Sequence, residues 1–193
     1  KIEHFIQRKA MNIDGLGPET IDALFEKGLV KSPIDLYKLT YADLIGLDRF
    51  AAKSAQNLLN SLSNSISSSS LPRFLFALGI RHVGITVADK LAKHFKSIDA
   101  LIEASPQDLL DVDEIGEKIA ISLSQYLRDE TNIKRIKMFS ALGFKQEFIE
   151  QQVISDSDKL NGQTFVVSGV FSEFSRDELK KHIVANGGKV VSS

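Results

Sequence analysis

Glycines placed just before an expected helix are the residues of this sequence best suited to chemistry, and that chemistry is anion binding. Residues 13–17 read Ile-Asp-Gly-Leu-Gly, and Pro18 follows at the first expected helical position. Because glycine takes backbone angles closed to other residues, such a turn can be tight and lead straight into a helix. The first N–H groups of that helix have no partner within it, and with the positive end of the helix dipole they suit a phosphate oxygen. Gly17 should therefore need an unusual backbone angle, the close approach of a phosphate, or both.

Three weaker copies of this segment follow at a nearly constant interval. They lie at residues 47–51, 80–84 and 112–116, so the last positions of the four segments are 34, 33 and 32 residues apart. An interval this regular, with a helix start after each turn, is the helix–hairpin–helix pattern. We expect the middle apolar residue of each turn to point inward, and a Lys, Ser or Thr in the next helical turn to add a contact. Because backbone N–H groups hold the phosphate, such sites read no bases.

The turns together predict an interface with the sugar–phosphate backbone of DNA, although the copies differ. The third and fourth carry His82 and Glu114 where the first carries Gly15, and the second carries Arg49 and Ala51 at its two glycine positions. We interpret His82 as a turn residue, expect Arg49 to reach a phosphate itself, and expect Glu114 to repel a phosphate if it points outward. The predicted backbone-binding residues are Gly15, Leu16, Gly17, Thr20, Arg49, Phe50, Lys53, Ser54, Arg81, His82, Val83, Gly84, Thr86, Ile115, Gly116 and Lys118.

The composition limits other kinds of chemistry. The 193 residues carry 24 basic and 25 acidic side chains with no basic block, so DNA contact must rely on backbone amides and a few cations. The absence of cysteine excludes disulfides, thiolate metal sites and cysteine nucleophiles within this chain. The four histidines show no metal-ligand spacing, and no run of 18 apolar residues could span a membrane. We therefore predict no catalytic residue, no metal ligand and no membrane contact in this chain.

The elements that must position these turns are mainly helical. Apolar residues recur at helical spacing through residues 1–143, which we assign to four helix–hairpin–helix repeats. Seven of the ten residues at 61–70 are serine, which predicts a flexible linker or a frayed helix end between the second and third repeats. Residues 144–158 form a second predicted linker. Residues 159–193 then show a β-α-β pattern, with glycines before the second strand, so an α/β segment follows the helical one.

Several motifs in this order resemble the C-terminal half of bacterial NAD-dependent DNA ligases. The resemblance is carried by residues 5–17 (FIQRKAMNIDGLG), 53–59 (KSAQNLL), 71–84 (LPRFLFALGIRHVG) and 160–169 (LNGQTFVVSG), with 174–188 after them. It implies a mainly α fold of tandem helix–hairpin–helix repeats, followed by a truncated α/β BRCT segment of which residues 159–193 are the incomplete N-terminal part. It further implies that this part clamps duplex DNA near a nick, in an enzyme that seals nicks with NAD as adenylate donor.

The same resemblance places the catalytic parts elsewhere. The adenylation lysine of the family stands in a Lys-x-Asp-Gly motif, whereas the only Asp-Gly pair here, Asp14-Gly15, is preceded by Asn12 at the lysine position. We therefore expect this segment alone to be inactive and to bind no cofactor. NAD, a divalent metal such as Mg and a structural Zn are expected in the full-length protein. The expected partner is nicked double-stranded DNA, bound by a monomer in the bacterial cytoplasm close to the nucleoid.

Two other interpretations fit the repeats. One is a helix–hairpin–helix module of a different DNA repair or recombination protein, such as a nuclease subunit or a branch-migration factor. The other is a protein-interaction scaffold in which the hairpins only pack. Ser168-Gly169 after the first predicted strand would suit the scaffold, because some BRCT domains bind phosphate at this place.

Overall fold

The computed structural model describes residues 1–47, 50–149, 158–169 and 176–191, and it divides into a helical unit at 1–149 and a smaller α/β unit at 150–193. The expectation of a mainly α fold with an α/β segment at its end is confirmed. The helical unit contains α1 (Ile2–Ile6), α2 (Pro18–Glu26), the 3-10 helix η1 (Pro33–Lys38), α3 (Tyr41–Ile45), α4 (Ala52–Ser67), α5 (Leu71–Ala77), α6 (Ile85–Phe95), α7 (Ile98–Glu103), α8 (Pro106–Leu110), α9 (Glu117–Arg128) and α10 (Glu130–Ala141).

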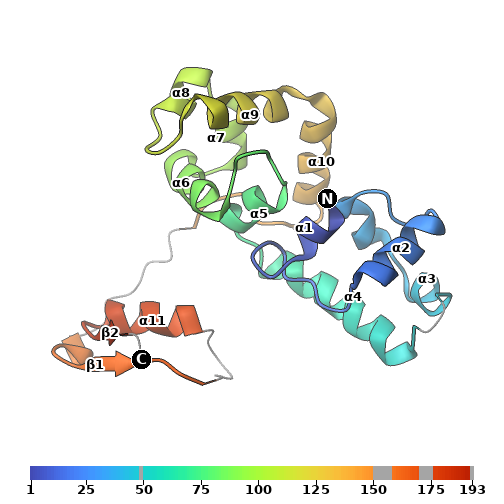
Figure 1. The fold of residues 1–193 in the computed structure, drawn as a ribbon, viewed down its shortest axis with the longest axis horizontal. Coiled ribbons are helices and arrows are strands. Elements are labelled where there is room, and N and C mark those ends of the chain that lie inside the picture. The colour runs from blue at the N-terminus through green and yellow to red at the C-terminus, as the bar shows by residue number, and fades with distance from the viewer. Residues whose placement is uncertain (48–49, 150–157, 170–175, 192–193) are drawn as a thin grey trace. The chain divides into compact units, whose positions relative to one another are not determined.

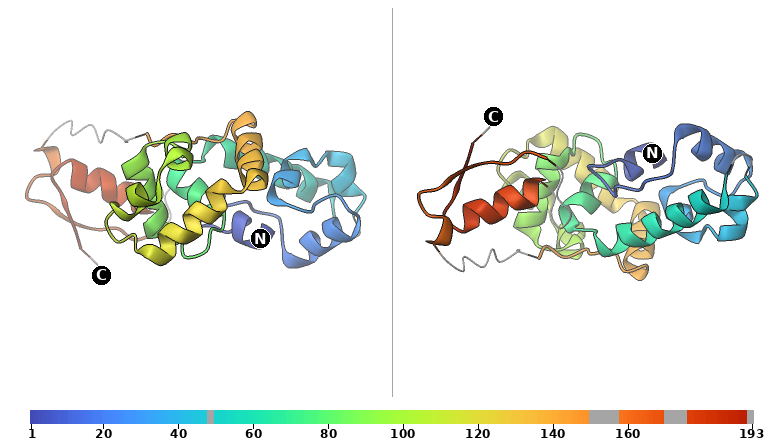
Figure 2. Two further views of the ribbon diagram at one scale, coloured as in Figure 1. Left: turned by 90° about the horizontal axis from the view of Figure 1, so that it is seen from above. Right: turned by 90° about the horizontal axis from the view of Figure 1, so that it is seen from below.

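Most helices of this unit pack as pairs on either side of a tight turn. Helix α5 packs against α6, α3 against α4 and α8 against α9, while α10 folds back on α9 and touches η1 (Figures 1 and 2). Two of the helices are followed by glycines with left-handed backbone angles, Gly28 (φ +68°) and Gly79 (φ +66°), a common way for a helix to end. This pairing leaves each predicted hairpin at the start of a longer helix.

The serine-rich segment at 61–70 is not the predicted linker. Helix α4 runs through it to Ser67, and the side chains of Ser65 and Ser69 are buried. The hydroxyl of Ser65 donates to the carbonyl of Leu62 at 2.7 Å and lies 2.8 Å from the Tyr37 hydroxyl. Because a serine hydroxyl can bond the carbonyl three residues earlier, it can be buried in a helix without an unpaired donor. The linker alternative was wrong because it treated serine as a solvated residue, whereas a helix does end within the segment, at Ser67.

An aromatic cluster of Phe5, Tyr37, Phe74, Phe139 and Phe144 forms the middle of the helical core. Its rings come from α1, η1, α5, α10 and the segment after α10, and the Phe139 ring centroid lies 5.2 Å from that of Phe5, 5.5 Å from that of Phe74 and 5.1 Å from that of Phe144. Burial raises the pKa of the Tyr37 hydroxyl. The cluster therefore joins the first half of the helical unit to the second.

The second predicted linker begins later than the sequence indicated. Phe144 is buried, Ile98 N–H donates to the carbonyl of Gln146 at 2.9 Å, and Phe148 N–H donates to the carbonyl of Lys96 at 2.6 Å. The chain thus stays attached to the turn between α6 and α7 through these contacts. The rest of the predicted linker, at 150–157, lies outside the described residues.

The α/β unit shows the predicted β-α-β order. It contains η2 (Asp158–Leu160), β1 (Thr164–Val166), α11 (Arg176–Ala185) and β2 (Lys189–Val191), and the two strands pair in parallel with Phe165 opposite Val190. Gly188 lies so close to α11 that a Cβ there would be 2.7 Å from Ile183 Cγ2. Across the described ranges of both units, no helix is long and apolar enough to cross a membrane.

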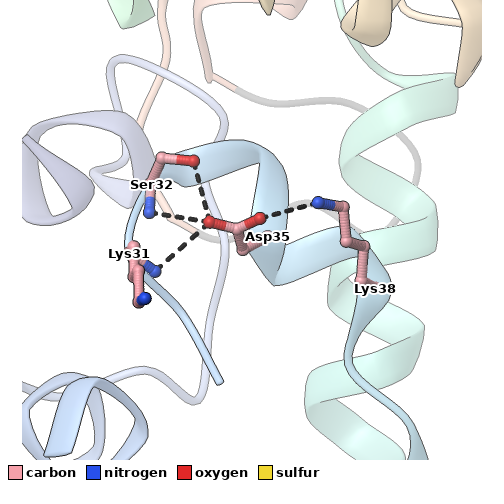
Figure 3. A network of polar contacts seen from close by, with 4 residues as sticks. All are labelled: Lys31, Ser32, Asp35 and Lys38. Atoms are coloured by element: carbon pink, nitrogen blue, oxygen red, sulfur yellow. Dashed lines mark hydrogen bonds and ion pairs between the residues drawn. The ribbon is translucent and has the colours of Figure 1, made fainter. Parts of the chain in front are cut away.

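The start of η1 contains a charged cap (Figure 3). One Asp35 carboxylate oxygen accepts from the backbone N–H groups of Lys31 (3.2 Å) and Ser32 (3.0 Å) and from the Ser32 hydroxyl, and the other accepts from the Lys38 ammonium at 2.8 Å. Burial raises the pKa of Asp35, but the contacts with Lys38, Ser32 and Lys31 outweigh it and hold the pKa below its ordinary value. The cap therefore stabilises the fold only while the carboxyl is ionised.

Replacing Asp35 by Asn should lower the melting temperature near neutral pH by roughly 2–4 °C, the shift expected when one helix cap is weakened in a domain of this size. Because the folded pKa of Asp35 is depressed, its contribution is present above the ordinary aspartate pKa and is lost as the pH falls below that value. Melting curves of parent and variant should therefore converge toward about pH 3. Asp22→Asn, on the exposed face of α2, is the matched control. A gap between parent and variant that stays constant with pH would contradict this account.

Candidate nucleic-acid interface

Three of the four predicted hairpins close with the same backbone hydrogen bond. The fourth residue of the turn donates to the first, Phe50 N–H to Leu47 O at 3.2 Å in the second hairpin, Val83 N–H to Ile80 O at 3.0 Å in the third and Ile115 N–H to Val112 O at 3.0 Å in the fourth. The third residue of the turn, which precedes the middle apolar residue of the hairpin, has a positive φ, as at His82 (+67°). This is the pattern of a type II turn, whose third residue must be left-handed. The corresponding φ is +90° at Gly15 and +64° at Glu114.

The middle apolar residues fix these turns to the core. Leu16, Val83 and Ile115 are buried, and Phe50 is half-buried against the same core. In the first hairpin the backbone N–H of Asp14 also donates to the Ser61 hydroxyl of α4 at 2.8 Å. The inward-pointing anchors expected from the sequence are confirmed, and His82 is confirmed as a turn residue.

The last position of each hairpin has an ordinary backbone conformation. Gly17 (φ −85°), Gly84 (φ −82°) and Gly116 (φ −86°) are extended residues that begin α2, α6 and α9, as Ala51 (φ −75°) begins α4. The expectation of an unusual backbone angle at Gly17 is therefore wrong, because the turn places its left-handed residue two positions earlier. A Cβ at Gly17, Gly84 or Gly116 would have no atom of the described residues within 4 Å. Neither conformation nor packing within the described structure requires glycine at these three positions.

The helices that follow the hairpins also begin without a side-chain cap. Among the residues that the structure describes, no side chain accepts from the first N–H groups of α2, α4, α6 or α9. Of the other α-helices in the helical unit, α3, α7, α8 and α10 are capped by Thr40, Ser97, Ser105 and Asp129, whereas α1 and α5 also lack a side-chain cap. Since the residues at the N-cap positions of the hairpin helices are also exposed, the amide donors there are open to a ligand. The arrangement suits phosphate oxygens at the three hairpins that end in glycine, whereas the Ala51 methyl group lies at the corresponding place in the second.

Side chains that could assist the amides lie in the first turns of the same helices. Lys53 and Ser54 on α4, Thr86 on α6 and Lys118 on α9 are exposed, and Arg81 is exposed within the third hairpin. Thr20 on α2 is half-buried. Each of these predicted residues therefore accompanies its own hairpin, and Arg49 lies outside the described residues.

The fourth hairpin is acidic, and a lysine that the sequence prediction missed holds its carboxylates. Lys90 Nζ of α6 lies 2.8 Å from Glu114 Oε1 and 2.9 Å from Asp113 Oδ2. The contacts to Glu114 and Asp113 raise the pKa of Lys90, and the Lys90 ammonium lowers the pKa of Asp113. Glu114 is thus paired with a cation of the third repeat. The sequence signal for this pairing is weak, because only the fold brings Lys90 to a turn 23 residues away.

Comparisons with known proteins give the same segmentation. A helix–hairpin–helix tandem of the SAM-like type matches residues 8–64, a helix–hairpin–helix motif matches 73–136, and a BRCT (BRCA1 C-terminal) domain matches 155–193. Proteins named DNA ligase from Cytophaga hutchinsonii and Flavobacterium johnsoniae are each 52% identical to all 193 residues, and one from Francisella tularensis is 38% identical over the same length. The chain spans less than a third of these relatives, 29%, 29% and 28% of their lengths.

Proposed function

Because the whole chain is homologous to a segment of bacterial DNA ligases, we propose that it is the part of such an enzyme that holds duplex DNA by its sugar–phosphate backbone. One observation carries the proposal. Gly17, Gly84 and Gly116 stand at uncapped helix N-termini, with ordinary backbone angles and open space where a side chain would lie. A phosphate needs that space to reach the amide donors, so glycine is useful there for binding rather than for folding.

The full-length protein is proposed to seal nicks in duplex DNA, with NAD as adenylate donor and with Mg and Zn bound in its other parts. We propose that this segment itself holds none of these groups. It has no cysteine, and the described residues contain no group of three His, Asp or Glu side chains that could hold a metal. It also lacks the Lys-x-Asp-Gly motif, so we propose that the segment alone forms no adenylate. The proposed partner is nicked duplex in the bacterial cytoplasm, at the nucleoid, bound by a monomer.

The 193-residue chain should bind short duplexes with equal affinity whatever their base sequence. Backbone amides at the hairpins contact phosphates only, so the affinity should not depend on the order of the bases. Since the chain has nearly balanced charge, few counterions are released, and the logarithm of the binding constant should fall with the logarithm of salt concentration with a slope of about −4 or shallower. Fluorescence anisotropy titrations at several salt concentrations measure both quantities. A clear preference for one duplex over shuffled duplexes of equal length would contradict the proposal.

A further inference from the structure

The fourth hairpin differs from the third in the charge around its amide donors. Its two central turn residues are Asp113 and Glu114, whereas the third hairpin has Arg81 and His82 at these positions. Both carboxylates belong to exposed residues close in the chain to the start of α9. Like charges within about 8–10 Å, one screening length in physiological salt, repel each other. Left alone, these carboxylates would oppose a phosphate at the fourth hairpin.

Lys90 of α6 is placed to reduce that repulsion. Its ammonium contacts both carboxylates, at 2.9 Å from Asp113 and 2.8 Å from Glu114, and its side chain is 26% exposed, less than half the 59% of Lys93 further along α6. The single ammonium offsets one of the two negative charges, so a third group meets a smaller repulsion than the two carboxylates alone would exert. The ammonium is also already engaged by two acceptors, which leaves it poorly placed to bind a phosphate directly.

We propose that Lys90 is a positioning residue that makes the fourth hairpin acceptable to a DNA phosphate, by offsetting part of the negative charge of Asp113 and Glu114 and by holding both carboxylates toward α6. This inference rests on the proposed function, since it concerns how one of the four hairpins binds duplex. Lys90 lies on α6, which begins at the third hairpin, whereas the carboxylates that it contacts belong to the fourth hairpin, at the start of α9. The fourth hairpin therefore depends on the third repeat for its binding.

The test measures duplex binding by the full 193-residue chain in the parent and five variant forms, one of them a control. Lys90→Met should weaken binding about fivefold at low salt, because the negative charges of both carboxylates are then no longer offset or held toward α6. Asp113→Asn with Glu114→Gln should bind at least as tightly as the parent. Adding Lys90→Met to that pair should weaken binding less than Lys90→Met alone does, because only the long-range attraction of one screened cation is then lost and no carboxylate is released. Lys90→Arg should bind like the parent, since it keeps the ion pairs.

Lys93→Met is the matched control, because Lys93 on the same helix pairs only with Asp89 of α6 among the ion pairs of the described chain. Its binding should stay close to that of the parent. If the triple variant binds as weakly as Lys90→Met, Lys90 contacts phosphate directly and the positioning role is refuted. If Lys90→Met binds like the parent, the fourth hairpin needs no neutralisation and the inference also fails. If the parent itself does not bind duplex, the proposed function fails first, and this inference falls with it.

Discussion

Replacing Gly17 and Gly84 together by alanine should weaken duplex binding by at least about 100-fold, because each of the two hairpins would lose a charge-assisted N–H contact worth about 1.5–3 kcal/mol. The added methyl groups occupy the space through which a phosphate reaches the first amides of α2 and α6. Anisotropy titration of parent and double variant with one labelled duplex measures the loss.

The same two substitutions should leave the stability of the folded state almost unchanged. The backbone is extended at both positions, with φ −85° at Gly17 and −82° at Gly84, and a Cβ added at either would meet no described atom within 4 Å. The second hairpin already carries Ala51 at this position with φ −75°. Melting curves and circular dichroism of the double variant should therefore match those of the parent. This separation of binding from stability distinguishes a ligand contact from a packing role.

Two controls sharpen the comparison. Lys134→Gln with Lys137→Gln removes two cations of α10, and it should weaken binding much less, because screened surface charges contribute about 1 kcal/mol or less each. Ala51→Gly should have the opposite effect and tighten binding, since it removes the one methyl group that lies at a hairpin end. If the double alanine variant stays folded and binds as well as the parent, the hairpins serve only to pack the helices.

The parts of this fold that are predictable from sequence are those set by local chemistry. Each hairpin combines a turn residue, an apolar residue and a following amphipathic helix, and this combination can be recognised in the sequence. Leu16, Val83 and Ile115 are the apolar residues of three hairpins, and they are buried as expected. The β-α-β order near the end of the chain is equally local, because strand and helix periods differ. The unusual backbone angle expected at Gly17 belongs to Gly15 instead, since sequence does not reveal which turn residue is left-handed.

The parts that are not predictable depend on tertiary partners. The serines of α4 look like a linker until Tyr37 and Leu62 are placed beside Ser65. The fourth hairpin looks unfit for an anion until Lys90 is placed against its carboxylates. Serine as a residue type suggests solvent exposure, but Tyr37 packs beside Ser65. The two acidic residues suggest repulsion of an anion, but Lys90 contacts both of them. Neither of these contacts can be read from the sequence around the residues concerned.

The aromatic cluster ties the two halves of the helical unit, and with them the hairpins, to one core. The first two hairpins lie in residues 8–64 and the last two in 73–136, which match two separate helix–hairpin–helix models. Phe5 and Tyr37 come from the first half, and Phe74, Phe139 and Phe144 from the second, yet their rings meet in one core. Two halves that share a core should unfold as one cooperative unit and present their hairpins in a fixed relation to one duplex.

Phe139→Ala should therefore lower the free energy of unfolding of the whole helical unit by about 3–5 kcal/mol, the usual cost of emptying an aromatic site in a packed core. Phe139 is 4% exposed and its ring contacts those of Phe5, Phe74 and Phe144. Urea titration followed by hydrogen exchange should show Leu24 of α2 and Leu91 of α6 losing protection together. Phe25→Ala, whose side chain is 60% exposed, is the control and should change stability by less than about 1 kcal/mol. If Phe139→Ala exposes only the second half while Leu24 stays protected, the halves fold independently, and their hairpins must find the duplex separately.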